Sequence, residues 1–218
     1  MTAWLVLQLA DATFPSGGFA HSGGLEAALH AGAFTAEGAF PRWLGDALWQ
    51  AGHTALPFVA AAHDSPGRLG ELDAAHDAAL RNPVLNAASR SQGRAHLDAC
   101  LRSLGGHELA ALRERARGGP QHLAPAFGAS LAVLGLERDA TLRLYLHGVA
   151  RGLLSAAVRL SLVGPAEAQR LHADAAPTLT AVLGRCGRLD PAAQTQVAPL
   201  HDLLAGTHDL LDARSFAS

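Results

Sequence analysis

A glycine-rich stretch near the N-terminus brings together residue types that carry out chemistry in many proteins. It runs from Leu7 to Glu26 and contains the neighbouring pair His21 and Ser22. Histidine, serine and glutamate act as general bases, nucleophiles or metal ligands when a fold holds them close to one another. The glycine pairs beside them are also a feature of loops that bind phosphate at the start of a helix. The stretch is therefore a candidate active-site loop.

The rest of the chain lacks the partners that such chemistry requires. All 17 basic residues are arginine, so the lysine of a P-loop or of a Schiff-base enzyme is missing, and no Gly-x-Ser-x-Gly motif occurs. No two of the 12 histidines lie three or four positions apart, so no helix presents two of them to one metal ion. Cys100 and Cys186 are isolated and indicate neither a disulfide framework nor a zinc site. We expect no catalytic residue, no cofactor and no dedicated metal site.

Composition favours one helical domain. Alanine and leucine dominate the 218 residues and aromatic residues make up 5%, which favours helix over strand. A chain of this length can bury one core, so we expect a single all-α domain over residues 1–218. The net charge of −2 provides no basic field for nucleic acid or an anionic membrane. No window resembles a membrane span and no basic segment leads into a long apolar run, so we expect a cytoplasmic protein.

The candidate loop lies between two predicted helices. Pro15, Gly17 and Gly18 interrupt the helical pattern, because proline lacks an amide hydrogen and glycine adopts backbone angles that other residues avoid. Phe14 and Phe19 are large apolar side chains in a loop, where polar residues are usual. One interpretation is that the two phenylalanines form a recognition surface. The other is that they pack inward, and that the glycines allow the loop to fold in this way. The residues alone leave both interpretations open.

We expect a single bundle of about ten helices joined by short loops. Apolar spacing, caps, glycines and prolines predict helices at about 3–10, 22–31, 36–62, 66–81, 84–104 and 107–117, one ending near 135, and others at 140–163, 165–186 and 191 onward. Pro57 predicts a kink or break, and 140–163 is expected to be the central core helix. Gly93 costs about 1 kcal/mol relative to alanine inside a helix, which favours a role in close packing or contact.

The chain resembles the urease accessory protein UreF family from end to end. The opening stretch matches the family signature at Leu7, Gln8, Leu9, Asp11, Pro15, Gly17, Gly18, Phe19, His21, Ser22, Gly24, Leu25 and Glu26. Further matches are Ala88, Ser89, Arg90, Gly93 and Arg94, then His122, Phe127 and Gly128, then Ala157, Val158, Arg159 and Leu160, and in the tail His208, Asp209, Arg214 and Phe216. The chain departs from the family pattern at Pro125, Asn86, Ala87, the segment 165–168, Ser215 and Ala217.

The resemblance implies a non-enzymatic helical scaffold for urease maturation. Such a protein dimerises, binds UreD, also called UreH, and recruits or regulates the GTPase UreG for nickel insertion into apo-urease. Residues 208–218 would then form a partner-binding tail. The candidate partner contacts are Pro15, Gly17, Gly18, Phe19, His21, Ser22, Glu26, Ser89, Arg90, Arg94, His208, Arg214 and Phe216.

Two alternatives belong to other classes. In the first alternative, the chain is itself a nickel-binding carrier that uses His21 and other histidines. In the second, it is a helical enzyme with a small-molecule pocket. The first predicts tight nickel binding by the isolated protein. The second requires a deep apolar cavity with convergent polar groups, a feature that the sequence does not reveal.

Overall fold

The computed structural model describes residues 3–218, and every regular element in that part of the chain is helical. The α-helices are α1 Ala3–Ala10, α2 Leu25–His30, α3 Ala39–Thr54, α4 Leu56–Asp64, α5 Leu69–Ala79, α6 Pro83–Leu104, α7 His107–Ala116, α8 Leu123–Val133, α9 Arg138–Arg159, α10 Pro165–Asp174, α11 Ala176–Cys186 and α12 Pro199–Gly206. Short 3-10 turns lie at η1 Gly18–Ala20, η2 Pro66–Arg68, η3 Pro191–Ala193 and η4 His208–Leu210. The all-α prediction is confirmed.

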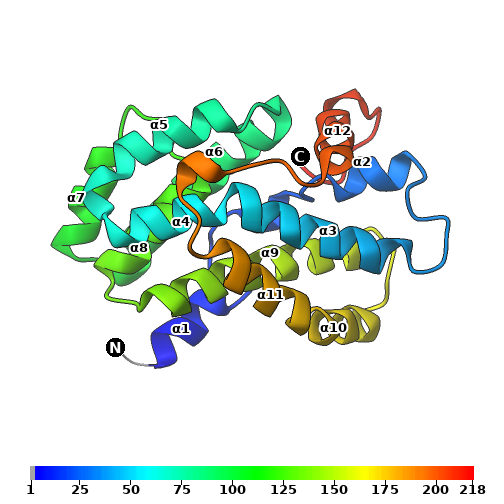
Figure 1. Ribbon diagram of the computed structural model, residues 1–218, viewed down its shortest axis with the longest axis horizontal. Coiled ribbons are helices and arrows are strands. Elements are labelled where there is room, and N and C mark those ends of the chain that lie inside the picture. Colours follow the sequence, from blue (N-terminus) through cyan, green and yellow to red (C-terminus); the bar gives the residue numbers. More distant parts are fainter. Residues whose placement is uncertain (1–2) are drawn as a thin grey trace.

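Helix α9 forms the centre of the fold. In Figure 1 it crosses the middle of the molecule, and it contacts α1, α2, α3, α4, α8, α10 and α11. Its buried side chains recur at intervals of three and four, as in Leu142, Leu146, Ala150, Leu153 and Ala157. The predicted central core helix is therefore confirmed.

Proline residues decide where two of the predicted helices divide. The chain breaks between α3 and α4, and Pro57 lies in the first turn of α4, where its missing N–H costs no hydrogen bond. The single helix predicted over 165–186 is wrong, because the chain turns at Ala175 and Pro177 starts α11 in the same way. The apolar helix ending near 135 begins earlier than expected, at Leu123.

Helices α4 and α8 pack against each other at backbone contact distance. A Cβ atom on Gly128 would lie 2.1 Å from the carbonyl oxygen of Val59, far inside van der Waals contact. Only glycine fits this position without displacing a helix. This crossing joins the α5–α8 half of the molecule to α9 and its neighbours.

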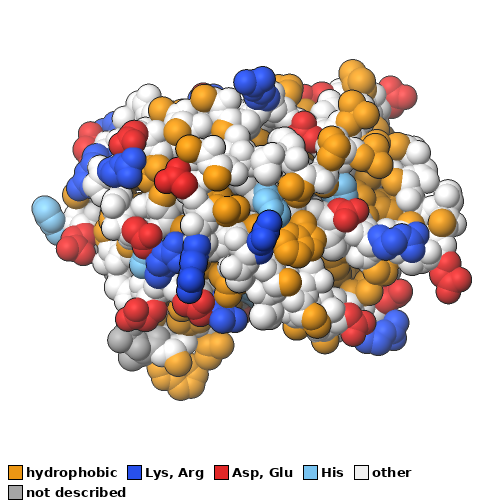
Figure 2. Space-filling model, in the orientation of Figure 1, with side chains coloured by type: hydrophobic (Ala, Val, Ile, Leu, Met, Phe, Trp, Pro, Cys, Tyr) orange, Lys and Arg blue, Asp and Glu red, His pale blue; other side chains and the backbone are white. Residues whose placement is uncertain are grey.

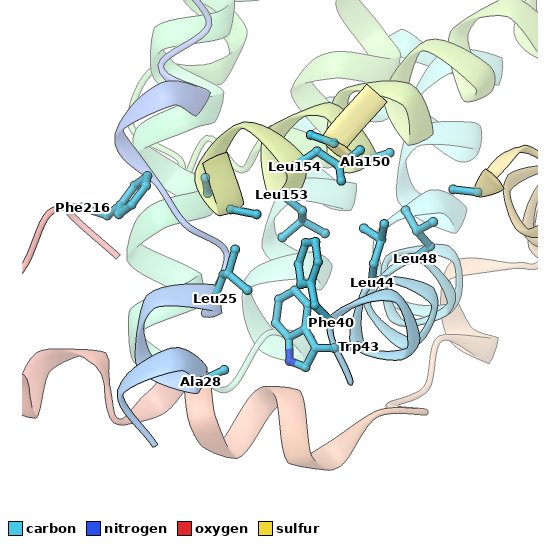
Figure 3. Close-up of a cluster of buried hydrophobic side chains, with 14 residues drawn as sticks. Leu25, Ala28, Phe40, Trp43, Leu44, Leu48, Ala150, Leu153, Leu154 and Phe216 are labelled. Atoms are coloured by element: carbon cyan, nitrogen blue, oxygen red, sulfur yellow. The ribbon is translucent and has the colours of Figure 1, made fainter. Parts of the chain in front are cut away.

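The largest apolar cluster includes the C-terminal tail. Figure 3 shows Phe40 and Trp43 of α3 beside Leu25 of α2 and Leu153 of α9, with Phe216 at the edge of the same cluster. Phe216 is only 6% exposed. The tail is therefore part of the core in this structure. Among residues 3–218, no helix combines the length and apolarity that a membrane crossing requires.

Two buried histidines predict acid sensitivity. Burial lowers the pKa of His76 to about 3 and that of His96 to about 4, from an ordinary value of 6.5. Between pH 6.5 and 4 the unfolded chain binds these two protons and the folded chain does not, so stability falls as pH falls. We expect the free energy of unfolding to drop by about 3 kcal/mol per pH unit near pH 5 from these two groups.

Urea denaturation at several pH values measures this slope. His96→Gln keeps a hydrogen-bonding side chain near the Ser130 hydroxyl, which lies 2.8 Å from His96 Nε2, but removes the titration. It should reduce this slope by about half, since one of the two titrating histidines is removed. The matched control is His107→Gln, at an exposed position in α7. An equal slope in the His96 variant and the wild type would contradict the assignment.

Candidate functional site

The opening loop, residues 11–24, takes its shape from local hydrogen bonds and glycine. The Asp11 carboxylate accepts hydrogen bonds from the backbone N–H and the hydroxyl of Thr13, at 2.6 and 2.5 Å. Gly17 has a φ of 76°, in the left-handed region that favours glycine. A Cβ atom there would also lie 3.0 Å from the Cβ of Ala95, so the loop passes close to α6.

The two phenylalanines of the loop point in different directions. Phe14 is partly buried, with its ring 6.4 Å from that of His96, and packs against the apolar cluster around Leu9 and Leu131. Phe19 is 70% exposed. Inward packing therefore holds for Phe14 and not for Phe19.

An arginine from α9 lies between two aromatic rings. The guanidinium carbon of Arg159 is 3.8 Å from the ring centroid of Phe19 and 4.0 Å from that of Phe216. Arg159 also donates a hydrogen bond to the backbone carbonyl of Phe19. The three side chains come from the loop, the central helix and the tail. Their stacking holds these segments together and leaves the Phe19 ring on the surface.

The end of the tail runs alongside the opening loop. The Ser22 N–H donates to the carbonyl of Ser218 at 2.6 Å, and the Ala217 N–H donates to the carbonyl of Ala20 at 2.8 Å. The Ser22 hydroxyl donates to the same Ser218 carbonyl at 3.0 Å, and His21 Nδ1 lies 2.6 Å from the Ser218 hydroxyl oxygen. His21 and Ser22 therefore hold the tail.

Glu26 is the buried acceptor for the tail. Its carboxylate accepts the backbone N–H of Ser215 at 2.6 Å and that of Phe216 at 3.2 Å, and it lies 3.0 Å from Nε2 of His208. Glu26 is 1% exposed and His208 is fully buried. Burial acts to raise the pKa of Glu26, but these hydrogen bonds outweigh it and lower the pKa below 4.5. Glu26 is thus a charged clamp, and it lacks the raised pKa of a general acid.

The fold therefore brings together predicted site residues from both ends of the chain. Ser22, Glu26, His208 and Phe216 are buried against their own protein, so they offer no exposed side chain to a partner in this conformation. Arg214 is exposed and pairs with Asp209 at 3.1 Å. Partner binding by these residues and by the tail stays a prediction. The structure adds that the tail is already docked on the opening loop.

A second polar cluster lies where α6 meets the loop before α8. Ser89 Oγ is 3.0 Å from His122 Nδ1, and His122 Nε2 is 2.9 Å from a carboxylate oxygen of Asp77. The serine oxygen also accepts the N–H of Leu123 at 3.3 Å, and His122 is fully buried. A serine, a histidine and an aspartate thus meet, but they fix a loop and present no free nucleophile.

Gly93 allows this loop to cross α6. A Cβ atom at position 93 would lie 2.0 Å from the carbonyl oxygen of Gln121, which confirms the predicted role in close packing. Gln121 has a φ of 65°, and the Asp73 carboxylate holds it by accepting the N–H groups of Gln121 and His122 at 2.6 and 2.7 Å. Arg90 and Arg94 of the same helix are exposed to solvent.

A cleft of about 500 Å³ lies between the opening loop and α9, and we call it the loop cleft. Its walls are mostly apolar and include Pro15, Gly17, Gly18 and Phe19 on the loop side. Gly148 and Gly152 leave the α9 wall open, since a Cβ atom on either would meet nothing within 4 Å. The molecule therefore has an apolar cavity, which is one of the features that a helical enzyme with a small-molecule pocket would require.

The loop cleft could not be found from the sequence, because its walls come from α1, α6, α8, α9, the opening loop and the tail. Nor was Arg159 singled out, although it belongs to one of the segments that match the family. Among residues 3–218, no group of three or more histidine, cysteine, aspartate or glutamate side chains is arranged to hold a metal ion.

These features define an all-helical protein with an aromatic-edged cleft beside a docked tail. The family model described as UreF matches residues 34–176. The chain is 33% identical to urease accessory protein F of Oryza sativa subsp. indica, over 99% of this chain and 85% of the relative. It is 34% identical to that of Arabidopsis thaliana, over 99% and 92%, and 32% identical to UreF of Mycobacterium sp. (strain JLS), over 100% and 99%. The chain belongs to the UreF family of urease accessory proteins.

Proposed function

We propose that this protein is a non-enzymatic scaffold for urease maturation in the cytoplasm. It binds UreD, recruits or regulates the GTPase UreG, and so supports nickel insertion into apo-urease, acting as a homodimer. The observation that carries the proposal is similarity over almost the whole chain to relatives named urease accessory proteins. These relatives cover the opening loop and the tail, which lie outside the range of the family model.

The surface around Phe19 is the proposed partner contact. Aromatic residues, phenylalanine included, and arginine are both enriched in protein–protein interfaces. Phe216 stacks on the other face of the same guanidinium, so the tail and the Phe19 surface form one unit. A partner that contacts Phe19 therefore also senses whether the tail is docked.

Exposed apolar side chains elsewhere supply further area for the dimer or for partners. Trp4 and Leu7 of α1 are 77% and 59% exposed, and Leu200 and Leu203 of α12 are 60% and 67% exposed. Figure 2 shows apolar side chains gathered over the α12 end of the molecule. Such surfaces are a feature of proteins that associate with other proteins.

A pull-down with UreD and GTP-loaded UreG tests the proposal. We expect the intact chain to capture both proteins, and Phe19→Ala to weaken capture by about tenfold or more with little change in melting temperature. The control is Val197→Ala, which removes an exposed apolar side chain outside the loop and outside the surfaces proposed for partners. Equal weakening by both variants would remove the assignment to Phe19, and no capture by the intact chain would overturn the scaffold function.

Equilibrium dialysis of the isolated protein separates the scaffold from the nickel carrier. The scaffold function predicts no tight, stoichiometric nickel binding. Stoichiometric binding that disappears in His21→Ala would favour the carrier and overturn the scaffold. Because His21 contacts the Ser218 hydroxyl, the His21 variant must also be checked for a docked tail.

A further inference from the structure

A polar groove lies on the outer side of α6, away from the loop cleft. It has a volume of about 540 Å³ and shares no lining residue with that cleft. We call it the arginine groove, and its lining residues are Asp77, Leu80, Arg81, Pro83, Asn86, Ala87, Arg90 and Arg94. The family resemblance marked two of these arginines without saying what they bind.

The three arginines of the groove lack acidic partners. Within residues 3–218, no carboxylate forms an ion pair with Arg81, Arg90 or Arg94. Six other arginines do have such partners, namely Arg68, Arg113, Arg117, Arg138, Arg143 and Arg214. The groove therefore keeps a net positive charge in a chain whose net charge is −2.

The single carboxylate in the groove is already occupied. Asp77 accepts a hydrogen bond from the side-chain amide of Asn86 at 3.0 Å and lies 2.9 Å from His122 Nε2. The hydrogen bond from Asn86 and then that with His122 lower its pKa, so it stays charged and bound. The charge of Arg90 also lowers the pKa of Asp77, so this carboxylate offsets part of the positive charge, and three arginines against one carboxylate leave the groove positive.

The groove is held in place by the cluster behind it. Ser89 and Gly93 face the loop before α8 and anchor α6 there, while Arg90 and Arg94 project one helical turn apart. Arg90 Nε donates to the carbonyl of Pro120 at 3.3 Å, which orients its guanidinium group. Guanidinium groups with fixed orientation bind carboxylates with two parallel hydrogen bonds.

We propose that the arginine groove docks a carboxylate-rich segment of a partner protein. Two guanidinium groups one helical turn apart, about 5–6 Å between their Cβ atoms, suit two acidic side chains on one partner segment. The groove is a second docking surface, separate from Phe19 and the tail. This proposal rests on the proposed function in one respect, which is that the partner is a protein of urease maturation.

Fluorescence anisotropy with the full chain tests the groove directly. The probes are a short labelled peptide rich in aspartate and glutamate, the same peptide with asparagine and glutamine, and inorganic pyrophosphate as competitor. We expect the acidic peptide alone to bind and its affinity to fall with added salt. Arg90→Glu and Arg94→Glu should each weaken binding by about tenfold or more. The control is Arg115→Glu, since Arg115 is an exposed arginine of α7 with no ion pair.

Several outcomes would overturn the proposal. The proposal fails if the acidic peptide does not bind, or if the uncharged peptide binds as well. It also fails if Arg115→Glu loses as much affinity for the acidic peptide as the groove variants do. Free glutamate serves as a second competitor. If pyrophosphate displaces the peptide at a lower concentration than free glutamate does, the groove is a phosphate site and the proposal is overturned. The pull-down with UreD and UreG is read separately. A chain that captures those proteins but no acidic peptide keeps its proposed function and loses the groove.

Discussion

Glu26→Ala is expected to release the C-terminal tail and to lower the free energy of unfolding by about 3–5 kcal/mol. The substitution removes the acceptor for the N–H groups of Ser215 and Phe216 and for His208, all at 3.2 Å or less. The Phe216 N–H and His208 would then be buried without this partner, which costs more than the hydrogen bonds alone contribute. Phe216 would also lose its place in the apolar cluster.

Hydrogen exchange and urea denaturation measure the two effects. Amide protons of residues 215–218 should exchange faster, while those of α9 stay protected in proportion to global stability. Glu26→Gln keeps one acceptor oxygen and is expected to fall between the alanine variant and the wild type. Glu108→Ala, at an exposed position in α7, is the control. Unchanged protection of the tail in Glu26→Ala would show that the carboxylate does not hold it.

The charge of Glu26 adds to the acid sensitivity of the buried histidines. Because its folded pKa is lowered, its stabilising contribution is present above its ordinary pKa of 4.5 and is lost as pH falls through the folded value. As pH falls, the stability that depends on neutral His76 and His96 is lost at higher pH, between pH 6.5 and 4. Acid is therefore expected to weaken the core first and the tail clamp afterwards.

Local sequence signals predicted much of the helical framework. Pro57 marked the break between α3 and α4, and the apolar spacing of Leu142, Leu146 and Leu153 marked α9 as the central helix. Such signals act over a few residues, and so helix boundaries follow from them. The division at Ala175 does not follow from the apolar pattern, because the alanine-rich segment around it continues the helical spacing up to Pro177 at the start of α11.

The arrangement of the candidate site depends on contacts that no local pattern encodes. His21 and Ser218 meet across 197 positions, and Arg159 meets Phe19 across 140. The sequence marked His21, Glu26 and Phe216 as unusual but did not show that they contact one another. Deleting residues 208–218 would expose apolar core, because Phe216 belongs to the largest apolar cluster, and would also remove the proposed partner contacts of the tail.

Gly93→Ala is expected to lower the free energy of unfolding by about 3 kcal/mol. The added Cβ atom would lie 2.0 Å from the Gln121 carbonyl oxygen and 2.6 Å from the carbonyl carbon of His122, both backbone atoms that no rotamer change can move. The loop must therefore shift. The Asp73 carboxylate, which holds Gln121 at positive φ by accepting the N–H groups of Gln121 and His122, would then lose these hydrogen bonds.

Gly45→Ala in α3 is the matched control, because a Cβ atom there meets nothing within 4 Å. Helix propensity predicts that it stabilises the protein by about 0.5–1 kcal/mol. Both variants replace a helical glycine with alanine. If the free energy of unfolding, measured by urea denaturation, falls in Gly93→Ala and rises in Gly45→Ala, the difference measures the cost of displacing the loop that crosses α6. Since Arg90 is tied to Pro120 in the displaced loop, Gly93→Ala should also weaken binding of the acidic peptide, whereas Gly45→Ala should not. Stabilisation by both variants would mean that α6 and the loop lie farther apart than described.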